Sequence, residues 1–528
     1  MFDHQFAHPI LPCSFAKTFE SGLLGSEKAE WRAMSAAGLG VARAIMQDYA
    51  ELRPVPDHLS VLALVGKGHN GGDALIACNE ILARYPRASV SVILACEEAA
   101  MKPLALRALR QLEGRVRRES VWPEMGTEGV RGLLEALVAG ESFDICLDGL
   151  LGLASEGSLR EPFGSIVAAV NAFQRIELRA AVDLPTGYAD RSESASFKAD
   201  FTYCTGIAKE PAFDMFAPLG RVRYIDLGFF EPVAALEEDP DAYVLMPTAL
   251  DPLRCFRPAS VDKRKFGHLF VVGGSAFMPG ALLMAVQAAV RSGVGLVTAF
   301  APASVAATLS AQVPEAMWVA WPETANGTLN PRAMPLLLER LVNKATAVLC
   351  GPGMGQDRNT EMVAQDIVRH VEQPVLLDAD ALRPKIIELA SKRKRGFGPV
   401  VVTPHAGEYQ RMSKAAVADV SNAGLRDFCK TYRLTTILKA PLTRLCDGDS
   451  ILYNTHGGPV LSRGGSGDIL AGLTGGMLAQ GSGSVLERLS RGLLLHAFSA
   501  ELLARESGQV AVQTTQIMDY LPRVLRGS

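Results

Sequence analysis

The sequence predicts an α/β protein with two domains, each built on a parallel sheet covered by helices. Three observations predict this fold. Short apolar runs alternate with longer helical patterns along the whole chain. Runs of this kind fit strands that are covered on both faces. A chain of 528 residues also exceeds what one hydrophobic core normally serves.

Strands are expected at the apolar runs, and the segments between them fit right-handed helical crossovers that join parallel strands. The first half contributes runs at 59–65, 88–95, 143–152 and 179–187, and the second half contributes runs at 268–274, 295–302, 345–353, 373–382, 398–408 and 434–443. Both halves therefore read as layered α/β units.

The boundary between the halves is expected near residues 231–260. This stretch is rich in Pro and Asp and interrupts the alternation of strands and helices. We therefore expect a first domain at 1–235, a linker at 236–259 and a second domain at 260–528.

Composition excludes several classes of protein. A formal charge of −3 gives no reason to expect nucleic acid or an anionic membrane as a partner. No apolar run reaches about 18 residues, so no membrane span is expected, and the first residues do not read as a signal peptide. The nine cysteines form no C-x-x-C pair. This pattern favours a reducing compartment, which we take to be the cytoplasm.

In the second half, clusters of Gly, His, Asp and Thr fall again and again where a predicted strand ends. Ligands bind beyond the carboxyl ends of the strands in open α/β sheets, so these clusters predict one site along one edge of a sheet. In chain order they are "GGSAFMPGA", "GPGMG", "DADAL", "TPHAGE", "KAPLT" and "GGSGD".

The last of these clusters predicts an anion site with a base beside it. Gly464, Gly465 and Gly467 can take positive φ, so consecutive N–H groups can point inward as a nest for a phosphate. A helix expected from about Ile469 adds its positive N-terminal end. Asp468 then lies where a carboxylate can take the proton of a substrate hydroxyl.

In the first half, a strand, a Gly-rich turn and a helix are expected at 61–85. Gly66, Gly68 and Gly71 satisfy G-x-G-x-x-G, and Glu97 or Glu98 lies where a ribose-binding acid would. Alone, this pattern indicates a dinucleotide-binding dehydrogenase. The "NGGD" that follows is not part of that fingerprint, because it adds side-chain oxygens to a turn that normally uses backbone N–H groups.

Two further strand ends in the first half supply oxygen ligands. Asp148 ends one apolar run, and "VDLPTG" places Asp183 and Thr186 three residues apart. Oxygens from Asn70, Asp148 and Thr186 can together hold a hard cation of low charge density. Turn and capping chemistry is the alternative explanation of these residues.

Over about residues 260–525 the chain resembles the NAD(P)H-hydrate dehydratase family of ribokinase-like α/β/α enzymes. The resemblance rests on the six clusters above together with "PEAM", and it implies Asp468 as the base and an adenine nucleotide, ADP or ATP, as co-substrate. Ala440 stands where the family usually has Gly. Asp378 and Asp380 are either helix-capping acids or support for Mg²⁺. The implied contacts are Ala281, Gly353, His405 and Asp468 for the hydrated cofactor, and Lys439, Ala440, Pro441, Leu442, Thr443 and Gly467 for the nucleotide.

Over about residues 15–230 the chain resembles the NAD(P)H-hydrate epimerase domain, which implies a Rossmann-like three-layer α/β/α fold. The resemblance rests on "MSAAG", "GKGHNGGD", "DGLLG", "VDLPTG" and the stretch 198–209. The family's Asn-Asn is His69-Asn70 here, and "LASEGSLREP" replaces a compact Gly-rich loop after Gly152. The resemblance implies K⁺ at Asn70, Asp148 and Thr186, a catalytic Asp183, and substrate contacts from His69, Asn70, Gly71, Gly72, Asp73 and Asp183.

Together the two halves predict a bifunctional enzyme that repairs hydrated NADH and NADPH. One domain would interconvert the two epimers at C6 of the nicotinamide ring, and the other would dehydrate the S epimer. The alternative is a ribokinase-like small-molecule kinase with a non-catalytic nucleotide-binding domain at its N-terminal end. We expect a homo-oligomer, although the sequence does not fix its size.

Overall fold

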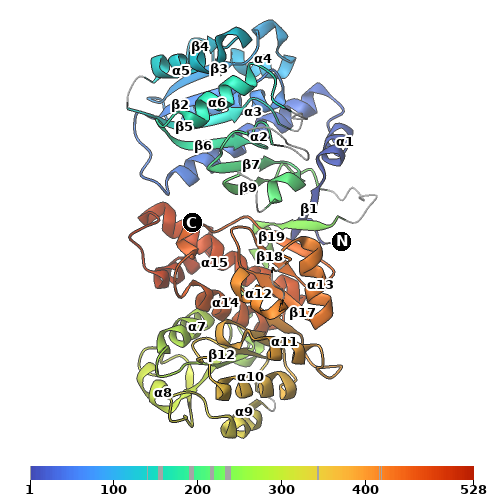
Figure 1. Ribbon diagram of the computed structural model, residues 1–528, viewed down its shortest axis with the longest axis vertical. Coiled ribbons are helices and arrows are strands. Elements are labelled where there is room, and N and C mark those ends of the chain that lie inside the picture. The colour runs from blue at the N-terminus through green and yellow to red at the C-terminus, as the bar shows by residue number, and fades with distance from the viewer. Residues whose placement is uncertain are drawn as a thin grey trace. The chain divides into compact units, whose positions relative to one another are not determined.

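The computed structural model describes residues 2–138, 141–152, 158–188, 196–214, 219–231, 240–341, 344–414, 417 and 419–527. Contacts divide the chain into two compact units, which we call the N-terminal unit (His8–Pro240) and the C-terminal unit (Asp241–Ser528, together with Phe2–Ala7) (Figure 1). Among the described residues, no helix is long and apolar enough to cross a membrane.

The N-terminal unit contains a seven-stranded sheet in the order β4-β3-β2-β5-β6-β7-β9. All neighbouring strands in it are parallel. Separately, β1 pairs with β8 in parallel through Ile10 and Leu11. The strands are β1 (Ala7–Leu11), β2 (Ser60–Val65), β3 (Ser89–Leu94), β4 (Arg117–Ser120), β5 (Phe143–Gly149), β6 (Ile176–Val182), β7 (Phe201–Thr205), β8 (Ala208–Lys209) and β9 (Arg221–Ile225), and the helices are α1 (Cys13–Leu23), α2 (Glu27–Tyr49), α3 (His69–Arg84), α4 (Pro103–Arg110), α5 (Gly126–Leu137) and α6 (Phe163–Ala172).

The period-2 alternation of strand side chains creates the three layers of this unit. Val61, Ala63 and Val65 of β2 pack in one core with α2, α3 and α4. Leu62 and Leu64 of the same strand pack in a second core, on the other face, with α5 and α6. The strand is apolar from Val61 to Val65, as expected where both faces are covered.

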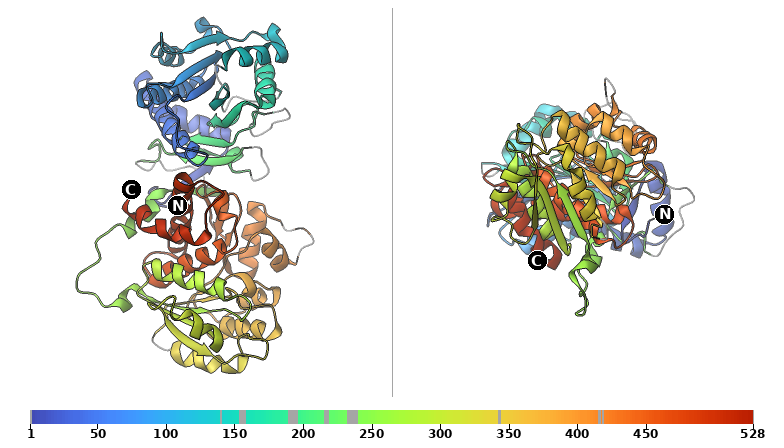
Figure 2. Two further views of the ribbon diagram at one scale, coloured as in Figure 1. Left: turned by 90° about the vertical axis from the view of Figure 1, so that its left-hand side faces the viewer. Right: turned by 90° about the horizontal axis from the view of Figure 1, so that it is seen from below.

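The C-terminal unit is built on a longer sheet with the strand order β13-β12-β11-β14-β15-β16-β17-β18-β19-β10. Helices lie on both sides of this sheet (Figure 2). Its strands are β10 (Ala242–Leu245), β11 (His268–Val272), β12 (Leu296–Pro302), β13 (Met317–Trp321), β14 (Ala347–Cys350), β15 (Val375–Leu377), β16 (Val400–Val402), β17 (Leu434–Leu438), β18 (Thr443–Cys446) and β19 (Ile451–Asn454), and its helices are α7 (Pro279–Arg291), α8 (Ala303–Leu309), α9 (Met334–Leu341), α10 (Arg358–His370), α11 (Pro384–Ala390), α12 (Ala406–Ser413), α13 (Asn422–Tyr432), α14 (Ser466–Gln480), α15 (Val485–Ser507) and α16 (Leu521–Arg526).

One part of this sheet differs from the expected parallel crossovers. β18 runs antiparallel to both β17 and β19. Only residues 439–442 join β17 to β18, and a parallel crossover needs a dozen residues or more. The "KAPLT" cluster is therefore a hairpin turn, although it still follows a strand end as expected.

The two central helices of this unit owe their close contact to glycines. A Cβ on Gly472 of α14 would lie 2.2 Å from the carbonyl oxygen of Ala285 in α7, and a Cβ on Gly476 would lie 2.0 Å from Ser292 Oγ. These distances are far inside van der Waals contact. Part of the glycine content after residue 467 therefore serves packing and not phosphate binding.

The first residues of the chain belong to the C-terminal unit, although the sequence places them in the first domain. The rings of Phe2 and Tyr243 pack edge to face with 5.0 Å between centroids. Phe6 is buried, and its carbonyl oxygen accepts a hydrogen bond of 3.0 Å from Met246 N. The chain enters the N-terminal unit only at His8.

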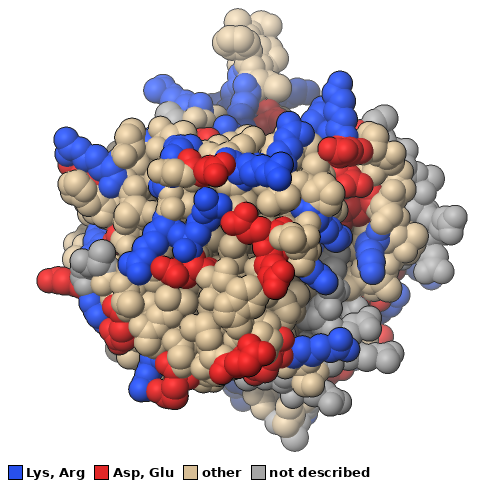
Figure 3. Space-filling model, turned by 90° about the horizontal axis from the view of Figure 1, so that it is seen from above, with Lys and Arg blue, Asp and Glu red and all other residues tan. Residues whose placement is uncertain are grey.

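Charge is mixed on the face of the molecule shown in Figure 3, where basic and acidic side chains are interspersed. This agrees with the formal charge of −3.

Candidate functional site

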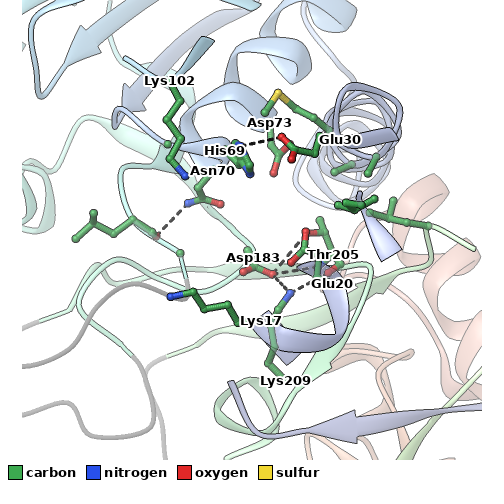
Figure 4. A pocket seen from close by; sticks show the side chains of 18 of the residues that line it. Lys17, Glu20, Glu30, His69, Asn70, Asp73, Lys102, Asp183, Thr205 and Lys209 are labelled. Carbon is green, nitrogen blue, oxygen red and sulfur yellow. Dashed lines mark hydrogen bonds and ion pairs between the residues drawn. The ribbon is translucent and has the colours of Figure 1, made fainter. Parts of the chain in front are cut away.

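A cavity of about 390 Å³ opens in the N-terminal unit and is lined by residues that follow β2, β5 and β6 (Figure 4). Its volume lies within the range of small-molecule sites. The predicted residues His69, Asn70, Asp73 and Asp183 all line it. Gly71 and Gly72 do not belong to the lining. A Cβ on Gly71 would lie 2.2 Å from Gly66 O, so this glycine lets the turn before α3 close.

Asp183 is held in an unusual conformation beside a buried lysine. It follows β6 with a φ of 69°, a left-handed conformation that is uncommon for residues other than glycine and that persists where the surroundings impose it. Its Oδ1 accepts a hydrogen bond from Lys209 Nζ and lies 3.5 Å from Thr205 Oγ1. Burial alone would lower the pKa of Lys209, but the neighbouring carboxylate of Asp183 outweighs this and raises it. The two side chains form a buried ion pair.

Asp73 faces the same cavity from α3. Its side chain is 8% exposed, and its Oδ1 has no hydrogen-bond partner. Burial raises the pKa of Asp73 well above its ordinary value, and the nearby carboxyls of Asp183 and Glu20 add to the rise. Burial also raises the pKa of Glu20. The cavity therefore combines two carboxyls of raised pKa with the Asp183–Lys209 ion pair.

The predicted cation ligands meet behind this cavity. Thr186 Oγ1 donates a hydrogen bond of 2.7 Å to Asp148 Oδ1 and accepts one of 3.0 Å from Leu151 N. Asn70 Nδ2 donates one of 3.0 Å to Leu151 O. Burial raises the pKa of Asp148 to about 6, while hydrogen bonds from Thr186 oppose the rise.

The donor set fits an alkali cation. Asn70 Oδ1 is buried with no hydrogen-bond partner, which leaves an oxygen free for an ion beside the hydroxyl of Thr186 and the carboxylate of Asp148. Among the described residues, no group of three or more His, Cys, Asp or Glu side chains is arranged to hold a metal ion.

Sequence reasoning missed several residues of this cavity. Glu20 and Lys17 reach it from α1 and Lys209 from β8, and Lys102 also lines it. Lys209 ends the apolar stretch "TGIAK", and a lysine in such a run was the one available signal. The loop after Gly152 cannot be compared with its expectation over 153–157, because these residues lie outside the described part of the chain.

The second site lies where β11, β14, β15, β16 and β17 end. These strands are parallel neighbours, so the clusters that follow them meet at one edge of the sheet, as expected. The sixth cluster, "GGSGD", follows a short 3-10 turn instead of a strand and opens α14.

Asp468 lies in the first turn of α14, opposite a lysine. Lys439 Nζ is 3.1 Å from Asp378 Oδ1 and 3.8 Å from Glu408 Oε2. A Cβ on Gly467 would lie 3.2 Å from the same Nζ, so the lysine approaches the backbone of the helix end. Burial raises the pKa of Asp468 to about 7; Asp378 adds to the rise and Lys439 opposes it.

The loop before α14 differs in part from the expected nest. Gly465 has a φ of 88° and is the N-cap of α14, but Gly464 and Gly467 do not take positive φ. The helix starts earlier than expected, at Ser466, so Gly467 already has helical backbone. Ser466 Oγ, in the first residue of α14, lies 3.3 Å from Nε2 of the buried His496. Sequence reasoning missed this contact.

His405 and Glu408 form the start of α12. His405 Nδ1 accepts hydrogen bonds from Gly407 N at 3.0 Å and Glu408 N at 3.3 Å, and Glu408 Oε2 accepts one of 2.9 Å from His405 N. This reciprocal pair caps the helix. His405 N-caps α12 through its own ring, and its side chain remains 58% exposed, available to a ligand.

The remaining predicted residues lie around this centre. A Cβ on Gly353 would lie 3.1 Å from Ala281 Cβ, so these two positions adjoin. The hairpin Ala440–Thr443 is closed by a 3.0 Å hydrogen bond from Thr443 Oγ1 to Ala440 O.

The two acids of "DADAL" differ in their partners. Asp378 does not cap its short helix and instead accepts a hydrogen bond of 2.7 Å from Thr403 Oγ1. Asp380 Oδ2 accepts one of 2.9 Å from Gly355 N. Neither side chain makes a capping hydrogen bond, although Asp378 stands at the N-cap of this short helix and Asp380 lies in its first turn.

Fold and sites together define a two-domain α/β enzyme with an acid–lysine site in each unit. The model of the family described as NAD(P)H-hydrate dehydratase matches residues 269–523, and that described as YjeF-related protein N-terminus matches residues 31–210. The bifunctional NAD(P)H-hydrate repair enzyme Nnr of Gloeobacter violaceus is 33% identical over 85% of this chain and 84% of its own length. That of Moorella thermoacetica is 30% identical over 88% and 87%.

The chain belongs to the family of bifunctional NAD(P)H-hydrate repair enzymes. The family resemblance, the α/β fold class and the enzyme class predicted from the sequence are thereby confirmed. Among solved structures, an ADP/ATP-dependent NAD(P)H-hydrate dehydratase from Bacillus subtilis, co-crystallised with ATP and Mg²⁺, is 27% identical over 52% of this chain and 93% of its own, with a TM-score of 0.45.

Proposed function

We propose that the N-terminal unit interconverts the C6 epimers of hydrated NADH and NADPH, and that the C-terminal unit dehydrates the S epimer with an adenine nucleotide. ADP is the nucleotide we favour over ATP. The observation that carries the proposal is the arrangement of Asp468 and Lys439 at the N-terminal end of α14. It places a base of raised pKa beside a cation and a helix end, and phosphoryl transfer to a hydroxyl needs these parts.

In the C-terminal unit, Asp468 takes the proton of the C6 hydroxyl while that oxygen attacks the terminal phosphorus of the nucleotide. The bond from this phosphorus to the bridging oxygen breaks, so that ADP leaves as AMP. The backbone N–H groups at the start of α14 and the Lys439 ammonium offset the negative charge of the phosphate. Phosphate then leaves C6 with the bonding electrons, and C5 loses a proton, which restores the double bond of the dihydronicotinamide.

The other predicted residues of this unit hold the two substrates. Lys439, Thr443 and Gly467 would contact the nucleotide, with Ala440–Leu442 forming the rest of its hairpin. Ala281, Gly353 and His405 would contact the hydrated cofactor. Asp378 and Asp380 supply oxygens of the kind that Mg²⁺ takes together with nucleotide phosphates, and the ion would offset phosphate charge.

In the N-terminal unit, we assign Asp183 to the reaction and Asn70, Asp148 and Thr186 to a K⁺ ion. The orphaned Asn70 Oδ1 supports this donor set. The ion would fix the loops after β5 and β6 and offset the charge of the substrate phosphates. His69, Asn70 and Asp73 would contact the substrate along the cavity wall.

The decisive experiment incubates the protein with a mixture of both hydrated NADH epimers and follows recovery of NADH absorbance, with and without ADP. We expect complete recovery with ADP and none without it. Asp183→Asn should recover only the S fraction. Recovery independent of any nucleotide, or formation of a stable phosphorylated product, would instead indicate a different enzyme.

We further propose that the protein works in the cytoplasm as a homo-oligomer. The nine cysteines form no C-x-x-C pair, as suits a reducing compartment. Light scattering on the purified protein would show the assembly directly, and a mass equal to one chain would exclude it.

A further inference from the structure

We infer that Asp73 is the general acid of epimerisation and protonates the departing C6 hydroxyl, while Asp183 acts as base on the opposite face of the hydrated ring. The inference rests on the proposed epimerase function of the N-terminal unit. It goes beyond that function in giving Asp73 a chemical role in place of simple contact.

The first argument is geometric. Asp73 points into the cavity from α3, whereas Asp183 and Lys209 approach from the strand side (Figure 4). The Asp73 side chain is 8% exposed, and its Oδ1 has no partner within the described part of the protein. A buried polar atom without a partner is rare. A substrate hydroxyl in the cavity would supply the missing hydrogen bond.

The second argument is the different surroundings of the two acids. Burial raises the pKa of Asp73 well above its ordinary value, which favours the protonated form that a general acid needs. Asp183 instead forms a buried ion pair with Lys209. Two carboxyls whose surroundings differ in this way suit the acid and the base of one reaction.

The substrate needs that pair. C6 of the hydrated ring carries a hydroxyl and is bonded to N1. Protonation of this hydroxyl by Asp73 lets the C6–O bond break with its electrons going to oxygen, which leaves as water, while the N1 lone pair forms a C6=N1 double bond. A water molecule then adds to C6 from the other face, and Asp183 takes the proton it releases. The product is the opposite epimer, with one C–O bond broken and one formed.

The proton then has to return from Asp183 to Asp73, and Glu20 offers a route. It faces the same cavity from α1 and interacts electrostatically with both aspartates and with Lys209. It is only partly buried, so it can exchange protons with solvent. Partial exposure also makes it a poorer candidate than Asp73 for the acid that touches the ring.

The test measures inversion at C6 and oxygen exchange together, using the full chain in water enriched in ¹⁸O. Pure R hydrate of NADH is followed by NMR for inversion and by mass spectrometry for label. The wild type should take up one ¹⁸O with each inversion. Asp73→Asn should lower both rates by about 10²–10⁴-fold, the usual effect of losing a positioned proton donor, because an amide keeps the shape but cannot give up a proton.

Two controls separate chemistry from folding. Glu80→Gln makes the same replacement of a carboxyl by an amide on the same helix, away from the cavity lining, and should leave inversion unchanged. Dehydration of pure S hydrate by the C-terminal unit of the Asp73→Asn protein should also match the wild type, and NADH, as a non-reacting probe, should still raise its melting temperature.

Three results would overturn the inference. They are inversion at the wild-type rate in Asp73→Asn, inversion by the wild type without ¹⁸O uptake, and loss of inversion in Glu20→Gln with Asp73→Asn unimpaired. In all three the wild-type protein still interconverts the epimers, so the epimerase function would stand. A wild type that fails to interconvert them would defeat both proposals.

Discussion

Asp468 is the residue on which dehydration should depend most. Asp468→Asn should lower the rate of dehydration by about 10²–10⁴-fold, because a positioned proton acceptor is lost. Nucleotide binding should change by less than about tenfold, since Asn is the same size and phosphate charge is offset mainly by Lys439. Single-turnover kinetics and nucleotide titration separate the two effects.

The pH dependence of dehydration by the wild type is a second test of Asp468 as the base. The pKa of Asp468 is raised to about 7, so below pH 7 the carboxyl is protonated and cannot accept a proton. The kcat/KM for dehydration should therefore rise with pH through about 7 and then level off. A profile already flat between pH 5 and 8 would contradict the assignment of Asp468 as base.

Lys439 should serve the nucleotide and not the hydrated cofactor. Lys439→Ala should weaken apparent ADP affinity and leave that for the hydrated cofactor nearly unchanged, because the ammonium lies beside Gly467 at the helix end. Lys439→Arg, which keeps the charge, should recover part of the loss. Steady-state kinetics with each substrate varied in turn would measure both affinities. A change in the apparent affinity for the hydrated cofactor alone would contradict the assignment of Lys439 to the nucleotide.

Asp148 should make epimerisation depend on a monovalent cation. Replacing K⁺ by Li⁺ should slow epimerisation, since the smaller ion fits oxygens spaced for K⁺ poorly. Asp148→Ala should remove both the ion dependence and most of the activity. Dehydration of pure S hydrate by the same protein should be unaffected. Equal epimerisation rates in the two salts would mean that these oxygens are structural.

At the scale of elements, the turn between β2 and α3 offers a matched pair of glycines. Gly71→Ala would bring a Cβ to 2.2 Å from Gly66 O, whereas Gly68→Ala meets nothing within 4 Å. We expect Gly71→Ala to destabilise the N-terminal unit by about 1–3 kcal/mol or more and Gly68→Ala by less than about 0.5 kcal/mol. Thermal unfolding of both variants is the measurement; similar melting temperatures would show that the turn relaxes freely.

Elements were the most predictable level of this molecule. Every apolar run singled out from the sequence overlaps a strand, from β2 at Ser60–Val65 to β17 at Leu434–Leu438, because short runs of β-branched residues bounded by turn signals favour strands covered on both faces. The reversal at β18 was missed, since the short turn 439–442 reads equally well as a binding loop.

Single side chains were less predictable than elements. Sequence motifs include Asp183, Asp148 and Asp468, and those motifs predict positions at the ends of strands or helices. Glu20 carries no motif, and Lys209 only ends the stretch 198–209, which does not mark it as a site residue. Both enter the cavity because β8 and α1 pack beside it, and local sequence does not predict that tertiary placement.

At the scale of the whole molecule, the two units should differ in stability when each is produced as a separate fragment. A fragment of residues 8–240 contains all of the N-terminal unit and should still epimerise. A fragment of 241–528 lacks Phe6, and losing a buried phenylalanine side chain costs about 3–5 kcal/mol. It should therefore unfold at a lower temperature than the same unit in the full chain.

Adding residues 2–7 as a free peptide, or fusing them ahead of Asp241, should restore part of this stability. Calorimetry would measure it. A 241–528 fragment as stable as the parent unit would show that the contacts of Phe2 and Phe6 contribute little.

The contacts of residues 2–7 can form only after a much later part of the chain has been synthesised. Thr248 donates a hydrogen bond to the carbonyl oxygen of Gln5 across 243 residues of sequence. At about 5–20 residues per second, the leading segment waits on the ribosome for roughly 12–50 s before its partner emerges. A chain whose synthesis stops between the two halves therefore contains the N-terminal unit. Its residues 2–7 still lack the residues against which they pack. Residues 2–7 thus gain their partners only when residues near the middle of the sequence have been made.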